Sequence, residues 1–406
     1  MAEPILYFTD PVTQELLRRR WSLQVIDGPD RGKTAELRDA PALIGAAPSA
    51  SLVLSDDTVS RYHAELDPLA HGLRVRDLDS TNGSFLVGED RIRAGFVSNG
   101  EIFRVGQTVV RAVARDEAAA SEIETDPHLT PPGEVEILGG LSAVATRSKA
   151  LFRLIRRIAP SSSPVLLEGP IGSGKGALAH LIHELSGRTG PLRTLAAGIA
   201  PPTSLGRILF GREQEAGLLE LAAAGTLYLE DVELLPEPVA ARLTRALRQG
   251  EVEREGDPKV RRIDVVLVTA TTKPLAHLDP GLLGEVGAIR LSVAGLDERR
   301  ADLPYLFDAL LTRHCRAPIR VGTGVRAFLE AQRFPRNLKD LELLVGRVLT
   351  FPHPPNNPQE LELWSALLAG VVEQHQGHLG RAAQSLGVSE RTLLLALKNG
   401  GVDLGL

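Results

Sequence analysis

The pattern of hydrophobic and polar positions changes twice along the chain. From about Trp21 to Ala114, apolar residues alternate with polar ones in short runs such as "WSLQVIDG" and "EIFRVGQTVVRAV". Gly, Asp, Asn and Ser separate these runs. A period of two is typical of strands that bury one face, and frequent turn residues favour many short strands. We therefore predict an all-β sandwich over residues 21–114.

Residues 137–350 follow a different pattern. The apolar runs "SPVLLEG", "GTLYLED", "DVVLVTATT" and "AIRLSV" alternate with stretches of helical period, and from about residue 298 only the helical pattern continues. Alternating strands and helices indicate a parallel sheet, so we predict an α/β domain that ends in a helical portion. Residues 361–406 are helical throughout and predict an all-α end domain. We expect linkers at the acidic segment 115–136 and at the proline-rich segment 351–360.

Length, composition and charge limit the possible classes of protein. A chain of 406 residues exceeds one core, and 43% hydrophobic with 24% charged residues is typical of globular domains. The lone cysteine, Cys315, excludes an internal disulfide and favours a reducing compartment, so we expect a cytoplasmic protein. No apolar run is long enough to span a membrane, and we expect no membrane partner. A net charge of −5 leaves DNA binding to a local patch.

The segment "GPIGSGKGALAH" carries the clearest chemistry. It follows an apolar run and opens a helical stretch, which is the context of a phosphate-binding loop. Glycines let backbone N–H groups approach phosphate, and the helix N-terminus adds positive potential. We expect bound ATP or ADP, with Mg²⁺ accompanying it and no separate protein metal site. An unliganded glycine-rich turn is the alternative. The predicted nucleotide-binding residues here are Gly169, Gly172, Ser173, Gly174, Lys175 and Gly176.

The first block carries motifs of a recognition domain. Gly45, "VSRYH" and "STNG" occur in order within the strand-rich segment. Together they resemble a forkhead-associated (FHA) domain, which implies binding of a phosphothreonine protein. The resemblance places Ser60 and Arg61 on the phosphate and Asn82, with Thr81 beside it, on the peptide backbone.

Two further positions qualify that resemblance. His63 is implied to brace the loop without touching ligand. Ala46 stands where the family usually has an arginine, and alanine lacks the charge-assisted hydrogen bonds of a guanidinium. A domain that binds no phosphopeptide and serves as an interaction module therefore remains open.

The second block resembles the AAA+ domain of the bacterial enhancer-binding activators of sigma-54 RNA polymerase. The resemblance rests on the loop segment together with "ILFG", "GTLYLEDVELLP", "LRQGEVEREG", "GLDERRADLPYL" and "FPRNLKDLELLVGRVL". It implies a homo-oligomeric ring that hydrolyses ATP between subunits and remodels the polymerase.

The working parts of that motor depart from the family. The family's Asp-Glu pair is reversed to Glu230-Asp231, and we name these two as the catalytic candidates. Carboxylates displaced by a methylene slow a reaction steeply, and a missing arginine finger typically loses about 10³–10⁵ in turnover. We therefore expect an ATPase-like domain with weak or no activity. The other departures are Thr272 at the sensor asparagine, Asp279 and Glu285 in the segment that carries the arginine fingers, and the nucleotide-binding candidate Lys339 at the lid's sensor arginine.

A whole segment is also missing. Between "ILFG" and "LLELAAAGTLYL", the family inserts a loop that touches the sigma factor, whereas this chain has only "REQEAG". Residues Arg212–Gly217 leave no room for that loop. The standard remodelling of sigma-54 polymerase is therefore not expected.

The tail "HLGRAAQSLGVSERTLLLALKNGG" resembles a Fis-type helix-turn-helix. Leu393 and Leu397 are expected in its core, whereas Leu395 and Ala396 occupy surface positions that are often basic in the family. From residue 360 onward five acidic residues oppose three basic ones, so we expect weak DNA binding, with a dimerisation or partner surface as the alternative. The predicted DNA-binding residues are Arg381, Ser389, Arg391, Thr392 and Lys398.

Taken together, these features predict a transcriptional regulator of the sigma-54 enhancer-binding type that holds nucleotide with impaired hydrolysis. The alternative is a signalling adaptor, in which an FHA domain binds phosphoproteins and the AAA+ domain serves oligomerisation.

Overall fold

The computed structural model describes residues 7–9, 16–37, 41–69, 72–86, 91–118, 134–315, 319–349, 353–355 and 357–402. The expected linker 115–136 lies mostly outside the described residues, as do positions 351, 352 and 356 of the second expected linker, 351–360. The chain forms two compact units. One comprises Met1–Pro127, Arg153–Glu168 and Lys175–Ser292, and the other comprises His128–Phe152, Gly169–Gly174 and Val293–Leu406.

The N-terminal part of the first unit is a sandwich of two sheets. Its long strands alternate as the sequence predicts, with Trp21, Leu23 and Val25 buried on one face of β2. One sheet has the order β1-β2-β12-β11-β8-β9, with β3 on β2, and the other has the order β10-β7-β6-β4-β5. The strands are β1 (Tyr7–Thr9), β2 (Leu16–Asp27), β3 (Thr34–Leu37), β4 (Ala42–Gly45), β5 (Leu52–Val53), β6 (Ala64–Leu69), β7 (Gly72–Asp77), β8 (Ser84–Leu86), β9 (Arg91–Ile92), β10 (Ala94–Val97), β11 (Ile102–Val105) and β12 (Thr108–Ala118).

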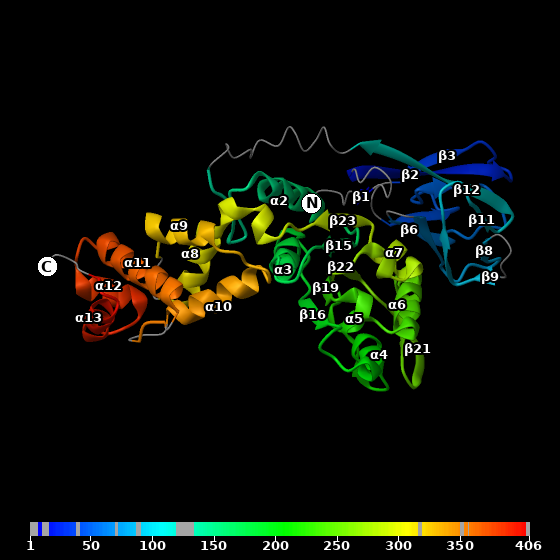
Figure 1. Cartoon of the computed structure of the whole chain (residues 1–406). Coiled ribbons are helices and arrows are strands. Elements are labelled where there is room, and N and C mark those ends of the chain that lie inside the picture. Colours follow the sequence, from blue (N-terminus) through cyan, green and yellow to red (C-terminus); the bar gives the residue numbers. More distant parts are fainter. Residues whose placement is uncertain are drawn as a thin grey trace. The chain divides into compact units, whose positions relative to one another are not determined.

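The rest of the first unit is built on a five-stranded parallel sheet of order β16-β19-β22-β15-β23 (Figure 1). The strands are β15 (Val165–Glu168), β16 (Leu192–Ala196), β19 (Gly225–Glu230), β22 (Val265–Thr271) and β23 (Ile289–Ser292). From β15 the chain runs to β16 at the far edge and finally returns to β23 on the other side of β15. The strand order therefore reverses at β15, and the carboxyl ends beside such a point form the usual ligand crevice of an open α/β sheet.

Helices and two hairpins complete this α/β domain. Helix α3 (Lys175–Leu185) lies over β19, where His183 and Thr226 hydrogen-bond through their side chains at 2.9 Å. The other helices are α4 (Pro202–Phe210), α5 (Leu218–Leu221), α6 (Glu237–Gln249) and α7 (Pro280–Val286). The hairpins pair β17 (Gly211–Arg212) with β18 (Glu215–Ala216), and β20 (Glu251–Arg254) with β21 (Asp257–Arg262).

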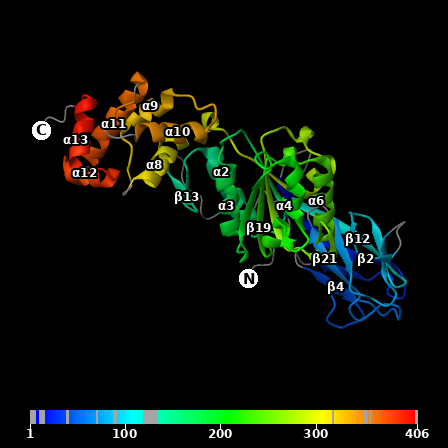
Figure 2. The same ribbon diagram turned by 90° about the horizontal axis from the view of Figure 1, so that it is seen from below.

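The second unit is mainly helical and has one continuous core. Phe307 of the lid and Trp364 of the tail are both fully buried in it. Figure 2 shows the helices of this unit gathered towards the C-terminus of the chain. Its elements are the hairpin β13 (Glu136–Leu138) and β14 (Leu141–Ala143), and the helices α8 (Leu303–His314), α9 (Thr323–Ala331), α10 (Leu338–Val348), α11 (Pro358–Gln374), α12 (Leu379–Leu386) and α13 (Glu390–Asn399). Helix α2 (Thr146–Ile158) contributes residues to both units.

The predicted fold class is confirmed: an all-β domain, an α/β domain with a helical lid, and an all-α end. The parallel sheet also contains the edge strand β16, which buries only Leu195 well and has no apolar run in the sequence. Among the described residues, no helix has the length and apolar character needed to cross a membrane.

Candidate nucleotide and phosphopeptide sites

The glycine-rich loop that the sequence predicts to bind phosphate lies between β15 and α3. Lys175 is the first residue of α3 and is 4% exposed. Gly172 and Gly174 have φ values of 71° and 100°, which L side chains rarely adopt. Glu168 ends β15 directly before the loop, and burial raises the pKa of its carboxyl, opposed by the charge of Arg290. The loop thus begins at the carboxyl end of the strand where the sheet order reverses.

Residues of the helical lid hydrogen-bond to the backbone of this loop. The side-chain amide of Asn337 donates to the Ile171 carbonyl oxygen at 2.8 Å, while its Oδ1 accepts from the Leu296 N–H at 2.7 Å. The Leu338 N–H donates to the Gly172 carbonyl oxygen at 2.9 Å. A Cβ on Gly172 would lie 2.2 Å from the Arg336 carbonyl oxygen, so only glycine fits there.

Arg299 donates from its guanidinium to the Ser173 carbonyl oxygen. Together with Asn337 and Leu338 it forms a clamp on the backbone of the loop. Arg299 and Asn337 were not among the predicted site residues. The segment "FPRN" could have pointed to Asn337, because asparagine at a turn often adopts a positive φ. Asn337 does so, with φ 54°. The predicted Lys339 is exposed on the first turn of α10, and its backbone lies against the loop at Gly172.

The two candidate catalytic carboxylates lie at the carboxyl end of β19, two strands from β15. Glu230 is the last residue of β19, and Asp231 follows in the left-handed conformation with φ 56°. Thr272, which the resemblance places at a sensor position, follows β22 and does not bind either of them in the contacts described. Its N–H and hydroxyl both donate to Glu233 Oε1 at 3.1 Å. Sequence reasoning missed Glu233 because 39 residues separate it from Thr272.

Both acidic residues in the expected finger segment have structural contacts. Asp279 caps α7 by accepting from the Leu282 N–H at 2.8 Å. Glu285 is 3% exposed and accepts from Arg248 Nε at 2.6 Å. A capping side chain and a buried ion pair are explained by stability alone.

The short segment after α4 forms the tight hairpin of β17 and β18. Gly211 pairs with Ala216 and Arg212 pairs with Glu215, so the turn contains only Glu213 and Gln214. The close pairing depends on glycine, because a Cβ on Gly217 would lie 2.3 Å from the Gly211 nitrogen. No long loop extends from this described segment.

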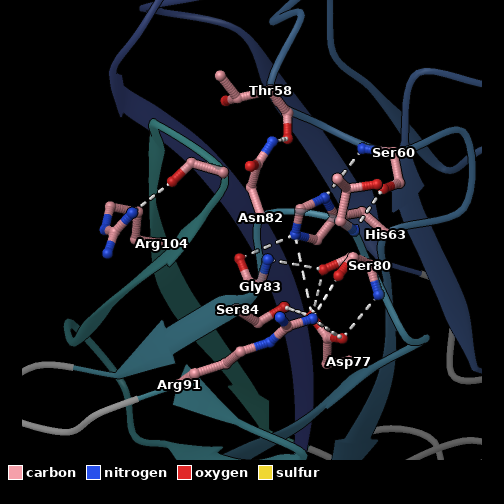
Figure 3. A network of polar contacts seen from close by, with 12 residues as sticks. Thr58, Ser60, His63, Asp77, Ser80, Asn82, Gly83, Ser84, Arg91 and Arg104 are labelled. Atoms are coloured by element: carbon pink, nitrogen blue, oxygen red, sulfur yellow. Dashed lines mark hydrogen bonds and ion pairs between the residues drawn. The ribbon is translucent and has the colours of Figure 1, made fainter.

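The predicted phosphopeptide residues lie on neighbouring loops of the sandwich, and Figure 3 shows Ser60 and Asn82 among them. Ser60 Oγ accepts from the Thr81 N–H at 3.1 Å, and the Asn82 side chain donates to the Thr58 carbonyl oxygen at 2.8 Å. Arg61, Thr81 and Asn82 are exposed. The structure therefore brings the loops that carry all four predicted residues together and leaves three of their side chains open to solvent.

Two buried groups support these loops from below. His63 is fully buried; its Nδ1 accepts from the Ser60 N–H, and its Nε2 lies 3.0 Å from the Gly83 carbonyl oxygen, to which it donates in that tautomer. Burial favours the neutral form of Asp77, but hydrogen bonds from Ser80 and Ser84 outweigh burial and lower the pKa of its carboxyl. Figure 3 shows these contacts converging beneath Asn82.

Ala46, where the FHA resemblance implies an arginine, borders the same site. Its N–H donates to the Ser60 carbonyl oxygen at 3.0 Å, and its side chain is exposed. The preceding Gly45 permits this approach, because a Cβ there would lie 2.1 Å from the Arg61 carbonyl oxygen.

The tail has the predicted helix-turn-helix, with one correction. Gly387 turns the chain with φ 74°, and Ser389 Oγ caps α13 by accepting from the Thr392 N–H at 3.0 Å. Leu393 and Leu397 are buried as predicted. Ala396 was predicted at the surface but is fully buried, because it lies three residues after Leu393 on the core face of α13.

The predicted DNA-binding residues of the tail differ in exposure. Arg381, Ser389, Arg391 and Lys398 are exposed, whereas Thr392 is half-buried and the Ser389 hydroxyl is engaged in the cap. Leu394 and Leu395, each 47% exposed, share the surface of α13 with them. Among the described residues, no group of three or more His, Cys, Asp or Glu side chains is placed to hold a metal ion.

Comparison with known proteins identifies two domain families. Residues 141–280 match the sigma-54 interaction domain, and residues 24–116 match the cytoplasmic domain of the inner membrane component of T3SS. The chain is 29% identical over 289 residues to the C4-dicarboxylate transport transcriptional regulatory protein DctD of Rhizobium meliloti, covering 62% of each. The alignment thus covers less than two thirds of that relative.

Two solved structures are also similar over part of the chain. NtrX from Brucella abortus in complex with ATP is 26% identical, with 65% of this chain and 70% of that chain covered and a TM-score of 0.49. A structure from work on phosphothreonine-dependent FHA domain interactions is 29% identical, with 23% of this chain and 95% of that chain covered and a TM-score of 0.22.

Proposed function

We propose that this chain, which carries a sigma-54 interaction domain behind an FHA-like domain, is a nucleotide-binding transcriptional regulator with little or no ATP turnover. The observation that carries the proposal is the contrast between two parts of the α/β domain. The loop before Lys175 keeps its backbone geometry, whereas Asp279 and Glu285 are committed to a helix cap and a buried ion pair.

In this function the loop binds the phosphates of ATP or ADP. Lys175 neutralises the terminal phosphates, and the first turn of α3 supplies backbone N–H groups. Glu230 and Asp231 provide the carboxylates that would face an accompanying Mg²⁺. No arginine occupies the two expected finger positions, and a finger is typically worth about 10³–10⁵ in turnover. Nucleotide then acts as a bound ligand, which supports homo-oligomer assembly.

The tail supplies DNA contact in this proposal. Arg391 and Lys398 are exposed on α13, and Arg381 is exposed on α12. Three cations release few counterions, so binding by one protomer is weak and gains from oligomerisation. The short β17–β18 hairpin supports a regulator that does not remodel sigma-54 polymerase in the usual way.

The test measures nucleotide binding and turnover by the full chain and by Lys175→Ala. We expect the wild type to bind ATP in the micromolar range or tighter, the variant to lose that binding, and turnover to stay at background. Sustained turnover that depends on Lys175 would contradict impaired hydrolysis. Genome-wide occupancy at native expression tests regulation, which predicts discrete promoter peaks.

A second candidate function is a phosphoprotein adaptor, and the preformed cluster at Ser60, Thr81 and Asn82 favours it. Arg61 is exposed beside this cluster, so Arg61→Ala should abolish partner binding and leave DNA binding unchanged. An empty genome-occupancy map together with loss of a partner in Arg61→Ala would select the adaptor over the regulator.

A further inference from the structure

The hydroxyl group of Tyr228 lies buried near the start of α3 and makes no hydrogen bond among the described residues. The side chain of Tyr228 is 2% exposed, and its hydroxyl has no hydrogen-bond partner among the described residues. A buried hydroxyl without a partner destabilises a protein, since it has lost water and gained nothing in return. Such a group calls for a ligand or another function.

The position of Tyr228 shows where that ligand would lie. Thr226 and Tyr228 are two residues apart on β19 and so share one face of the strand. Thr226 contacts His183 near the end of α3, whereas Tyr228 reaches the beginning of the same helix. A Cβ built on Gly176 would lie 3.8 Å from the Tyr228 ring and 4.0 Å from its hydroxyl oxygen. The hydroxyl is therefore next to the residue that follows Lys175.

Gly176 explains why a hydroxyl is needed there. Phosphate-binding loops usually have Ser or Thr after the lysine, and its hydroxyl coordinates the Mg²⁺ that accompanies the phosphates. Glycine leaves that position without a side chain. Burial raises the pKa of the Tyr228 phenol, and the charges of Glu230 and Asp231 raise it further. The phenol thus keeps its proton and is a hydrogen-bond donor at neutral pH.

We propose that the Tyr228 hydroxyl donates a hydrogen bond to a phosphate oxygen of a bound nucleoside di- or triphosphate, in the place that Gly176 leaves vacant. This inference rests on the proposed nucleotide binding and adds a residue that hydrogen-bonds to the phosphates. The hydroxyl comes from β19 instead of the loop. The Tyr228 phenol therefore takes the place of the side chain that Gly176 lacks. Tyr228 is a binding residue in this assignment and transfers no proton.

The test compares Tyr228→Phe with Thr226→Val in the full chain. Each variant removes one hydroxyl from the same face of β19. Loss of the unpaired Tyr228 hydroxyl should raise the unfolding temperature without nucleotide and weaken ATP and ADP binding about tenfold or more. Loss of the paired Thr226 hydroxyl should lower the unfolding temperature and leave nucleotide affinity unchanged. The effect on Tyr228→Phe should persist in EDTA, because the contact is to phosphate.

A rescue variant strengthens the test. Gly176→Ser in the Tyr228→Phe background returns a hydroxyl to the usual place, and its Cβ fits at ordinary van der Waals distance. Recovery of most of the lost affinity is expected in Mg²⁺-containing buffer, because a serine hydroxyl at this place coordinates the metal that accompanies the phosphates. If the wild type binds nucleotide, Lys175→Ala does not, and Tyr228→Phe matches the wild type, the inference fails while the proposed function stands. A loss of affinity confined to Mg²⁺-containing buffer would overturn the phosphate contact. A wild type that binds no nucleotide would overturn both.

Discussion

Arg248 donates from Nε to a carboxylate oxygen of the buried Glu285 at 2.6 Å. The resemblance to sigma-54 activators led us to expect arginine fingers in the segment that contains Glu285. Instead, Glu285 takes part in the packing between α6 and α7 through its contact with Arg248.

We expect Glu285→Arg to destabilise the domain and to restore no ATP turnover. The change buries a cation beside Arg248, and an uncompensated charge at a buried pair typically costs about 3–5 kcal/mol. Arg248 is half-exposed, so the loss should fall at the lower end of that range. Chemical unfolding and steady-state phosphate release measure the two effects. Glu253→Arg, at an exposed position on β20, is the control and should change neither. A rise in turnover in Glu285→Arg would contradict the structural role.

The lid's hold on the phosphate-binding loop predicts that Asn337→Ala weakens nucleotide binding. Its side chain joins the Ile171 carbonyl oxygen to the Leu296 N–H, and removing one such hydrogen bond costs about 1–3 kcal/mol when the partner stays buried. Affinity for ATP should fall at least tenfold in a titration with fluorescent nucleotide. Arg336→Ala removes an exposed neighbour that pairs with Asp340, and it should bind normally. Equal affinity in both variants would show that the clamp does not shape the loop.

At the other end of the chain, Ala46→Arg should create or strengthen phosphothreonine binding. Ala46 is exposed and its N–H contacts the Ser60 carbonyl oxygen, so a guanidinium there can reach a phosphate held by Ser60. Charge-assisted hydrogen bonds of this kind contribute about 1.5–3 kcal/mol, or at least a tenfold gain in affinity. Calorimetry with a phosphothreonine peptide library measures the gain, and Ser49→Arg controls for added charge. No gain with any peptide would favour an interaction module that binds no phosphate.

Stability of the lid should depend on pH through Asp308. Burial raises the pKa of its carboxyl from 3.8 to about 6, against the opposing hydrogen bond from the Val321 N–H. A raised folded-state pKa means that the protonated acid stabilises the fold. That stability is present below pH 3.8 and is lost as the pH rises through about 6.

Asp308→Asn removes this titration, so its α8 amides should exchange more slowly than the wild type's at pH 7.5. The difference should shrink towards pH 5. Hydrogen exchange by mass spectrometry resolves the lid from the other domains. The exposed Glu342→Gln on α10 is the matched control and should track the wild type. A constant difference across the pH range would contradict the role of Asp308.

The features that could be predicted from the sequence are those with local signals. The loop between β15 and α3 is recognisable because strand, glycines, lysine and helix follow one another directly. Gly387 and Ser389 likewise end one helix and cap the next through contacts within three residues. Period-two alternation around Trp21 predicted a strand, whereas no apolar run marks the edge strand β16, most of whose residues are not buried.

The contacts that define the site chemically are long-range, and the sequence does not reveal them. Thr272 binds Glu233, and Asn337 reaches Ile171 across 166 residues. From the sequence alone, Tyr228 resembles an ordinary core aromatic residue of a strand. In the structure, its hydroxyl without a partner among the described residues and the nearby Gly176 distinguish it. The prediction that Ala396 lies at the surface was wrong because it followed the family resemblance. The helical spacing from Leu393 places Ala396 on the core face of α13.

The central claim, that nucleotide is held and not broken down, is tested most directly by the chemical state of the bound ligand. The full chain is incubated with γ-labelled ATP and Mg²⁺ at protein concentrations above the dissociation constant, freed of unbound nucleotide, and quenched in acid at intervals. We predict that the label is retained in a Lys175-dependent manner and recovered as intact ATP over many minutes. Recovery of ADP with free phosphate within seconds, absent in Lys175→Ala, would contradict the account.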